Sequence, residues 1–200
     1  MKVDKIMENE MVTFCIAALF NLLILVALVW MWVVIIRLYI DKNYRDCPPY
    51  IPSFGKEKKI IIDNVSNILK NSKKQMVILD PGCGTGALLI NLAKNFREHH
   101  FIGIEWNKFS CWLCRLRARK LNNIEFICED MFNYNFGDAD IIVCFLMDPL
   151  MKKFGEKILH DNKKSQTIFS NTFKIPNLPL LEEIKTGKMF LFKNVYIYKL

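Results

Sequence analysis

The chain has few residues of the kinds that usually build metal centres or acid–base catalysts. Its 200 residues include only three histidines, His99, His100 and His160, and no cluster of residues has the spacing of metal ligands. No histidine or tyrosine is an obvious general base either. The sequence therefore predicts no metal, and it favours a chemistry in which the positioning of the reactants dominates.

The seven cysteines do not indicate a disulfide framework, because their number is odd. Cys128 and Cys144 lie in apolar patterns typical of strands, and Cys83 lies in a glycine-rich segment. We therefore predict free thiols in a reducing compartment. Cys111 and Cys114 have the spacing of a redox motif, but they fall inside a predicted helix rather than at a strand–helix turn, which favours coincidence.

Charge is missing from one long stretch near the N-terminus, between Val12 and Ile36. As a helix this stretch would be about 37 Å long, which exceeds the roughly 30 Å hydrocarbon core of a bilayer. It is too long for a typical signal-peptide core, and it is apolar on every face, which argues against a buried helix of a soluble protein. Trp30, Trp32 and Tyr39 lie near its C-terminal end, where interfacial aromatic residues are expected. The stretch predicts a single transmembrane helix and hence a lipid bilayer as a partner.

Basic residues are more numerous after this stretch than before it. Only Lys2 and Lys5 precede it, whereas the following segment contains Arg37, Lys42, Arg45, Lys56, Lys58 and Lys59. The positive-inside rule therefore places the rest of the chain on the cytosolic side, at the inner membrane if the protein is bacterial. The formal net charge of +8 is compatible with nucleic acid, anionic lipid or a solvated surface. Next to a membrane helix it favours lipid, and we expect no nucleic-acid partner.

The composition predicts four consecutive segments. Residues 1–11 form a short tail of mixed charge, residues 12–36 the transmembrane helix, and residues 37–53 a connector that Pro48, Pro49 and Pro52 stiffen. Residues 54–200 are enough for one α/β domain.

One glycine-rich stretch organises this domain. A short apolar run at residues 77–79 is typical of a buried strand, and Asp80 follows it. Gly82, Gly84 and Gly86 come next at alternate positions, before good helix formers that start at Ala87. A strand, a glycine turn and a helix together form the geometry in which backbone N–H groups converge on a ligand.

Two ligand classes fit this turn. Residues 82–87 match the dinucleotide pattern G-x-G-x-x-A, whereas residues 80–86 match D-x-G-x-G-x-G, which resembles motif I of class I S-adenosylmethionine (SAM) methyltransferases. Asp80 favours SAM over NAD, because a carboxylate would repel a pyrophosphate but suits the ammonium group of a methionine moiety. We therefore assign Asp80, Gly82, Cys83, Gly84 and Gly86 to cofactor binding. A glycine turn without a ligand is the structural alternative.

Acidic residues also follow the next two predicted strands. The strand at residues 101–105 ends at Glu105, about 20 residues past the glycines, where an acid can accept both ribose hydroxyls. The alternative is a surface glutamate at a strand end. The strand at residues 124–128 is followed by Asp130, for the adenine amino group, and Met131, for the adenine ring. We assign these three residues and Trp106 to the same cofactor site.

The fourth strand, predicted at residues 140–146, leads to Asp148 and Pro149. These residues resemble the D-P-P-Y type motif of amino-methylating enzymes, in which a backbone carbonyl and an acid orient the target nitrogen. Asp148 is therefore the candidate catalytic residue. The alternative is that Asp148 and Pro149 begin a helix over residues 150–159.

The other elements are assigned from periodicity. We predict helices at residues 59–69 and 108–121, a strand at 167–169, a connection at 176–181, and a hairpin of residues 189–192 and 195–199. In the helix at 108–121, Phe109, Trp112, Leu113 and Leu116 form the apolar face. Its basic residues, Arg115, Arg117, Arg119 and Lys120, predict a solvated outer face, or alternatively contact with lipid headgroups.

Taken together, the chain resembles a small class I methyltransferase with a Rossmann-like α/β sheet and helices on both faces. It is more closely similar to the single-pass membrane lysine methyltransferases that modify the ATP synthase c subunit and the adenine nucleotide translocase in mitochondria, and to their bacterial relatives. The segments that carry this similarity are the apolar helix, residues 49–53, residues 103–107, the helix around residues 112–118, and residues 145–150.

The resemblance implies a membrane-anchored SAM-dependent methyltransferase that N-methylates a lysine of a membrane protein. Residues 170–173 depart from the basic-aromatic run usual in the family, so the acceptor stays open. The alternatives are a methyltransferase of a lipid or small molecule, a non-catalytic SAM-binding membrane protein, and a membrane-anchored NAD-dependent enzyme.

Overall fold

The computed structural model describes residues 2–40, 55–186 and 194–200. The chain divides into two compact units, Met1–Pro49 and Tyr50–Leu200. Of the predicted connector, residues 41–53 lie outside the described residues.

The first unit contains one long helix, α1 (Lys2–Ile40). Within it, Thr13–Val34 has a mean hydropathy of 2.6, and none of this span is buried inside the protein. The predicted helix over residues 12–36 is therefore present, and it also continues through residues 2–11. By length and composition, α1 is a candidate for crossing a membrane.

The second unit is built on a seven-stranded sheet with the order β3-β2-β1-β4-β5-β7-β6. Strands β1 to β5 are parallel, and β7 runs antiparallel to both of its neighbours. The strands are β1 (Val77–Pro81), β2 (His100–Ile104), β3 (Ile124–Ile127), β4 (Ile141–Cys144), β5 (Thr167–Asn171), β6 (Leu180–Lys185) and β7 (Asn194–Lys199). Continuous apolar runs form the central strands because both faces of a parallel sheet are covered. The predicted Rossmann-like α/β fold is confirmed.

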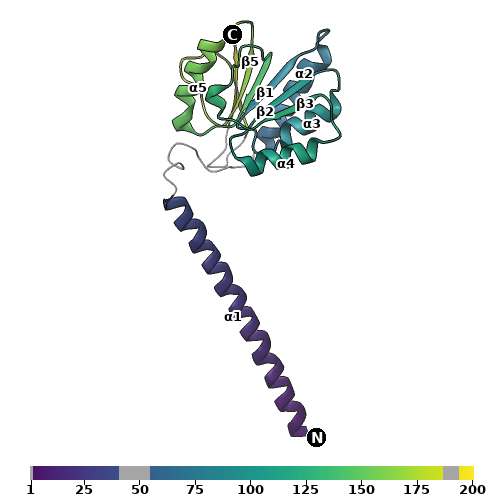
Figure 1. The fold of residues 1–200 in the computed structure, drawn as a ribbon, viewed down its shortest axis with the longest axis vertical. Helices are drawn as coiled ribbons and strands as arrows, with labels where there is room; N and C mark the ends of the chain where they lie inside the picture. The colour runs from purple at the N-terminus through teal and green to yellow at the C-terminus, as the bar shows by residue number, and fades with distance from the viewer. Residues whose placement is uncertain (1, 41–54, 187–193) are drawn as a thin grey trace. The chain divides into compact units, whose positions relative to one another are not determined.

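Helices cover both faces of the sheet (Figure 1). The helices α2 (Gly55–Asn71), α3 (Ala87–Asn95) and α4 (Lys108–Ala118) share one apolar core with Ile78, whereas α5 (Asp148–Asp161) packs on the opposite face with Leu79. Consecutive side chains of β1 serve different cores because side chains alternate along a strand. On the α5 face, side chains from connecting segments, such as Phe136 and Leu178, complete the core.

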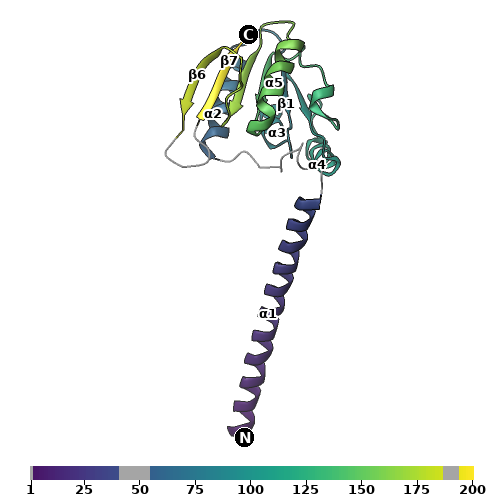
Figure 2. The same ribbon diagram turned by 90° about the vertical axis from the view of Figure 1, so that its left-hand side faces the viewer.

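The C-terminal hairpin differs from the prediction. The partner of β7 is β6 (Leu180–Lys185), so the connection predicted at residues 176–181 is wrong at its end, and residues 189–192 lie outside the described part of the chain. Figure 2 shows β6 and β7 at one edge of the sheet. Because β6 is an edge strand with mostly exposed side chains, its sequence lacks the apolar alternation that identifies a strand.

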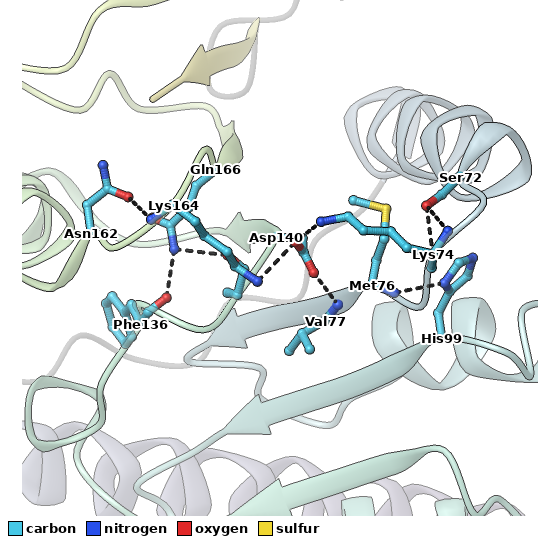
Figure 3. Close-up of polar contacts among 11 residues, drawn as sticks. Ser72, Lys74, Met76, Val77, His99, Phe136, Asp140, Asn162, Lys164 and Gln166 are labelled. Atoms are coloured by element: carbon cyan, nitrogen blue, oxygen red, sulfur yellow. Dashed lines mark hydrogen bonds and ion pairs between the residues drawn. The ribbon is translucent and has the colours of Figure 1, made fainter.

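A polar network closes the amino-terminal ends of the central strands (Figure 3). The Asp140 carboxylate accepts hydrogen bonds from the Val77 backbone N–H at 2.8 Å and from Lys74 Nζ at 3.0 Å, and it forms an ion pair with Lys164 Nζ at 3.0 Å. Burial alone would raise the pKa of Asp140, but these three donors together lower it. The network joins β1 to β4 at the amino-terminal ends of the strands, whereas the glycine turn lies at their carboxyl-terminal ends.

Two of the three histidines have structural roles. Buried His99 accepts a hydrogen bond on Nδ1 from the Met76 backbone N–H at 3.1 Å, and its Nε2 lies 3.2 Å from the Leu69 carbonyl oxygen. His160 Nδ1 lies 2.9 Å from Asp161 Oδ1. Neither contact involves the residues around the glycine turn.

Candidate active site

The glycine turn joins β1 to α3, and hydrogen bonds that its backbone N–H groups donate hold it in place. The N–H groups of Gly82 and Cys83 both donate to the Ile104 carbonyl oxygen, at 2.8 and 3.0 Å. The Gly86 N–H donates to the Cys83 carbonyl oxygen at 2.9 Å, and the Gly84 N–H donates to Glu105 Oε2 at 2.9 Å. These four donors therefore hold the loop in shape, instead of converging on a ligand as a pyrophosphate cradle would require.

Gly86 is required at the start of α3 for two reasons. Its φ of 66° lies in the left-handed region, which side chains other than glycine adopt at a cost. A Cβ at this position would also lie 2.7 Å from Phe126 Cζ and 3.1 Å from Cys114 Sγ. The turn therefore packs directly against β3 and α4, and this packing fixes the loop beside the end of β2.

Glu105 comes directly after β2, and the structure brings it to the glycine turn as predicted. It is 7% exposed, and its two carboxylate oxygens accept from the Gly84 N–H and the Asn107 N–H, each at 2.9 Å. Each oxygen keeps a second lone pair after these bonds. Glu105 thus stabilises the loop and can still accept hydrogen bonds from a ligand.

Asp80 lies near the end of β1 and is 8% exposed. Burial and then the neighbouring charge of Glu105 raise its pKa to about 7, against a smaller opposing effect of Lys58. Among the described residues, neither Asp80 nor Glu105 is in an ion pair. Two buried carboxylates without a cation favour a positively charged ligand over a pyrophosphate. SAM, which carries a sulfonium and an ammonium group, therefore fits this site better than NAD does.

The residues predicted to hold adenine follow β2 and β3. Trp106 is exposed directly after Glu105, and Met131 is buried beside Leu79 and Ile104. Asp130 Oδ1 accepts from the Phe132 N–H at 2.9 Å and so caps a short 3₁₀ helix, Met131–Asn133. This capping role was not predicted from the sequence, although the position of an aspartate directly before a short turn could have indicated it. Contact of these residues with adenine stays a prediction.

At Asp148 the structure confirms the helix start that the sequence left as an alternative. Helix α5 begins at Asp148 after Met147 as N-cap, with a proline in its first turn. Proline is favoured there because the first N–H groups of a helix have no partner within it. Of Asp148 the structure describes only the backbone, at the beginning of the helix that follows β4, so its catalytic role stays a prediction.

The end of β5 contributes polar residues that were not predicted as site residues from the sequence. Ser170, paired with Cys144 in the sheet, and Asn171 are buried. Ser170 Oγ donates to the Phe173 carbonyl oxygen at 2.6 Å, and Thr172 Oγ1 donates to Asn171 Oδ1 at 3.0 Å. The signal in the sequence is a change from apolar to small polar residues at the end of a strand. These residues lie at the same end of the sheet as Asp148, because β4 and β5 are parallel neighbours and their carboxyl ends lie side by side.

The face of α4 that packs on the domain is the opposite of the predicted one. Cys111, Cys114 and Ala118 are buried, whereas the predicted apolar face is exposed at Phe109, Trp112 and Leu116. The reason is the close approach of α4 to the glycine turn, where Cys114 Sγ donates to the Gly84 carbonyl oxygen at 3.1 Å and leaves no room for large side chains. The two cysteines are free thiols of the core, which agrees with a coincidental redox spacing.

Two arginines of α4, which were predicted to lie on a solvated face, hydrogen-bond to backbone carbonyl groups of the domain. Arg115 donates from Nε and Nη2 to the Phe126 carbonyl oxygen, at 3.1 and 2.9 Å. Arg117 donates from Nη1 to the Thr85 carbonyl oxygen at 2.8 Å. Both guanidinium groups therefore fasten α4 to the end of β3 and to the glycine turn.

Comparison with known proteins is consistent with this site. A family model described as the ANTKMT methyltransferase domain matches residues 80–182, slightly more than half of the chain. A protein-lysine N-methyltransferase of Saccharolobus islandicus is 25% identical over 165 residues, which cover 78% of this chain and 96% of that protein. A carboxy-S-adenosyl-L-methionine synthase of Helicobacter hepaticus is 34% identical over 96 residues, 46% of this chain. The chain spans only 40% of the length of that synthase.

Solved structures match the fold. An RNA methyltransferase from Salinibacter ruber, in complex with S-adenosyl-L-homocysteine, superposes with a TM-score of 0.62 at 17% identity. The match covers 74% of this chain and 93% of the other. At this identity the similarity establishes the architecture of the second unit.

Proposed function

The chain belongs to the ANTKMT methyltransferase domain family, and from this premise we propose that it is a membrane-anchored enzyme that transfers a methyl group from SAM to a lysine of a membrane protein. The observation that carries the proposal is the pair of buried carboxylates, Asp80 and Glu105, beside the glycine turn. The similarity to a protein-lysine N-methyltransferase over most of both chains supports a protein acceptor.

Each part of SAM has a matching group in this site. Asp80 would hold the ammonium end of the methionine moiety, and Glu105 the ribose hydroxyls. Trp106, Asp130 and Met131 would contact the adenine. When bound, SAM supplies an electrophilic methyl group, and the protein aligns the acceptor nitrogen with it.

The acceptor lysine must lose its proton before it can react. With a reference pKa near 10.4, deprotonation at pH 7 costs about 4–5 kcal/mol. Burial of the amino group at the sheet edge would lower this cost, because desolvation disfavours the charged form. The backbone carbonyl groups after β4 would orient the nitrogen by accepting its hydrogen bonds, and the Asp148 carboxylate would accept its proton.

The membrane part of the proposal depends on α1. Its apolar span, Thr13–Val34, is long enough to cross a bilayer, and the basic residues that follow favour a cytosolic catalytic domain. An enzyme anchored in this way meets its acceptor in two dimensions, so its substrates would be lysines at the cytosolic surface of membrane proteins.

The test is methyl transfer from labelled SAM by the purified full chain mixed with membrane fractions. We expect label in a protein band, on lysine after hydrolysis, and none with Asp80→Asn. Label in the lipid extract would identify a lipid methyltransferase and overturn the proposed acceptor. Binding of SAM without any transfer would indicate a non-catalytic SAM-binding protein.

A further inference from the structure

Helix α4 exposes an apolar stripe on the side that faces away from the core. Phe109, Trp112 and Leu116 are 70%, 56% and 43% exposed, at positions i, i+3 and i+7. The buried residues of the same helix, Cys111, Cys114 and Ala118, have the same spacing two positions later. Two residues correspond to about 200° around a helix, so the two stripes lie on opposite sides. The rings of Phe109 and Trp112 lie 5.8 Å apart, which makes the stripe a continuous aromatic surface.

The stripe is flanked by positive charge on both sides. Residues 108–120 contain no acidic residue and five basic ones, namely Lys108, Arg115, Arg117, Arg119 and Lys120. By helical geometry, Lys108, Arg115 and Arg119 fall on one side of the stripe, and Arg117 and Lys120 fall on the other. Large exposed apolar side chains between two basic rows are typical of a helix that lies in a membrane interface.

We propose that α4 docks on an anionic lipid surface, with Phe109, Trp112 and Leu116 inserted at the boundary between headgroups and acyl chains. Lys108, Arg119 and Lys120 would contact lipid phosphates, and each exposed lysine or arginine near such a surface contributes about 1 kcal/mol. Arg115 and Arg117 add positive charge beside the stripe while they donate to the carbonyl oxygens of Phe126 and Thr85. This charge pattern favours lipid over a protein partner, whose surface would normally present both signs of charge.

This inference rests on the membrane placement in the proposed function and makes it more specific. Helix α4 begins three residues after Glu105, so the docked surface adjoins the cofactor site. A docked α4 would therefore hold the carboxyl edge of the sheet near the bilayer, where the lysines of membrane proteins emerge.

The experiment uses full-length protein with a single tryptophan, in nanodiscs that contain phosphatidylglycerol with brominated acyl chains. The chain has four tryptophans, so Trp30→Phe, Trp32→Phe and Trp106→Phe leave only Trp112. We expect emission of Trp112 to be shifted to the blue and quenched at least twofold relative to discs without bromine. Unquenched emission at the wavelength of a solvated tryptophan would overturn the proposal.

A matched reporter tests whether quenching is specific to α4. In a chain without the four native tryptophans, Leu159→Trp places a single reporter on α5, on the opposite face of the sheet, where Leu159 is 46% exposed. We expect this reporter to stay unquenched. Equal quenching at both positions would show that the domain contacts lipid without orientation, and it would also overturn the proposal.

A third reporter distinguishes docking of α4 from membrane insertion of α1. A chain that keeps only Trp30 reports the insertion of α1. Quenching of Trp30 without quenching of Trp112 would refute docking by α4 and leave the proposed anchor intact. Quenching of Trp112 without quenching of Trp30 would support docking and refute the anchor.

Charge reversal tests the electrostatic part. Arg119→Glu with Lys120→Glu changes neither the stripe nor any residue assigned to SAM. We expect this variant to bind SAM as tightly as the same single-tryptophan chain without the two charge reversals, and to lose most of the Trp112 quenching in discs that contain phosphatidylglycerol. Unchanged quenching would show that anionic headgroups are not the partner.

Discussion

Replacing Asp80 with asparagine should stabilise the ligand-free protein at neutral pH and at the same time weaken SAM binding. The carboxyl group is buried, its pKa is raised to about 7 by burial and by Glu105, and an asparagine has almost the same shape without the charge. A residue whose removal helps folding but harms binding is retained for its ligand.

The size of the effect follows from the pKa of Asp80 in the two states. In the unfolded chain the pKa is 3.8, and in the folded protein it is about 7. The folded state therefore holds a proton that the unfolded state has released, so this contribution to stability is complete below pH 3.8 and is lost as the pH rises through 7. The difference of about three pKa units corresponds to about 4 kcal/mol. Asp80→Asn should remove this loss, so its advantage should grow from near zero at pH 4 towards about 4 kcal/mol at pH 8.

The assay is urea unfolding of the full chain in detergent between pH 4 and pH 8, with calorimetric titration of SAM at the same pH values. Because a positively charged ligand favours the ionised carboxylate, SAM binding to the wild type should release protons near pH 7 and tighten as the pH rises. Asp80→Asn should bind SAM more weakly and without this proton release.

Asp161→Asn is the matched control of opposite sign. Burial would raise the pKa of Asp161, but Lys157, at 2.8 Å, His160 and the Phe136 N–H lower it to about 2. Its contribution is present above pH 3.8 and is lost as the pH falls through about 2, so this variant should lose about 2 kcal/mol at pH 7. If Asp80→Asn gained nothing between pH 4 and pH 8, or bound SAM as tightly as the wild type, the role assigned to Asp80 would be wrong.

Three further predictions concern the same edge of the sheet. Gly86→Ala should destabilise the protein by about 1–3 kcal/mol in urea unfolding, because its Cβ would meet Phe126 and its φ is left-handed; an unchanged midpoint would contradict this packing. Glu105→Ala should weaken SAM binding at least tenfold in calorimetry, because it releases the Gly84 N–H and removes the ribose acceptor, and retained affinity would disprove the assignment. Cys144, whose pKa burial raises to about 12, should resist a thiol reagent until the protein unfolds, whereas exposed Cys128 should react at once; mass spectrometry of the labelled peptides distinguishes the two.

The sequence predicted the sheet well because its central strands are buried on both faces. Such strands need continuous apolar residues, and the runs around Ile78, Phe101 and Ile141 indicate them without any knowledge of the fold. The link between Glu105 and the glycine turn was also predictable, since the order of the elements brings the ends of β1 and β2 together.

Other features depend on contacts that no local pattern encodes. The orientation of α4 is set by its close approach to Gly84 through Cys114, so small side chains face the core although large apolar ones were available. The strand β6 has mostly exposed side chains, and the hydrogen bonds of β7 define it. The capping role of Asp130 depends on the residue at which β3 ends and the short 3₁₀ helix begins. A sequence predicts such boundaries only to within a few residues.

The acidic residues at the two ends of the parallel strands differ in their electrostatic surroundings. At the amino end, ion pairs with Lys74 and Lys164 neutralise the charge of Asp140. This carboxylate therefore has its counter-ions within the protein. At the carboxyl end, Asp80 and Glu105 are both buried and the charge of Glu105 helps to raise the pKa of Asp80, so a positively charged ligand would stabilise both carboxylates. The domain is therefore polarised along its strands. The ammonium group of SAM would act as a counter-ion for Asp80, and methyl transfer leaves this group unchanged. The spent cofactor would therefore keep this ion pair, lose only the more distant attraction of the sulfonium charge, and compete with fresh SAM for the same site.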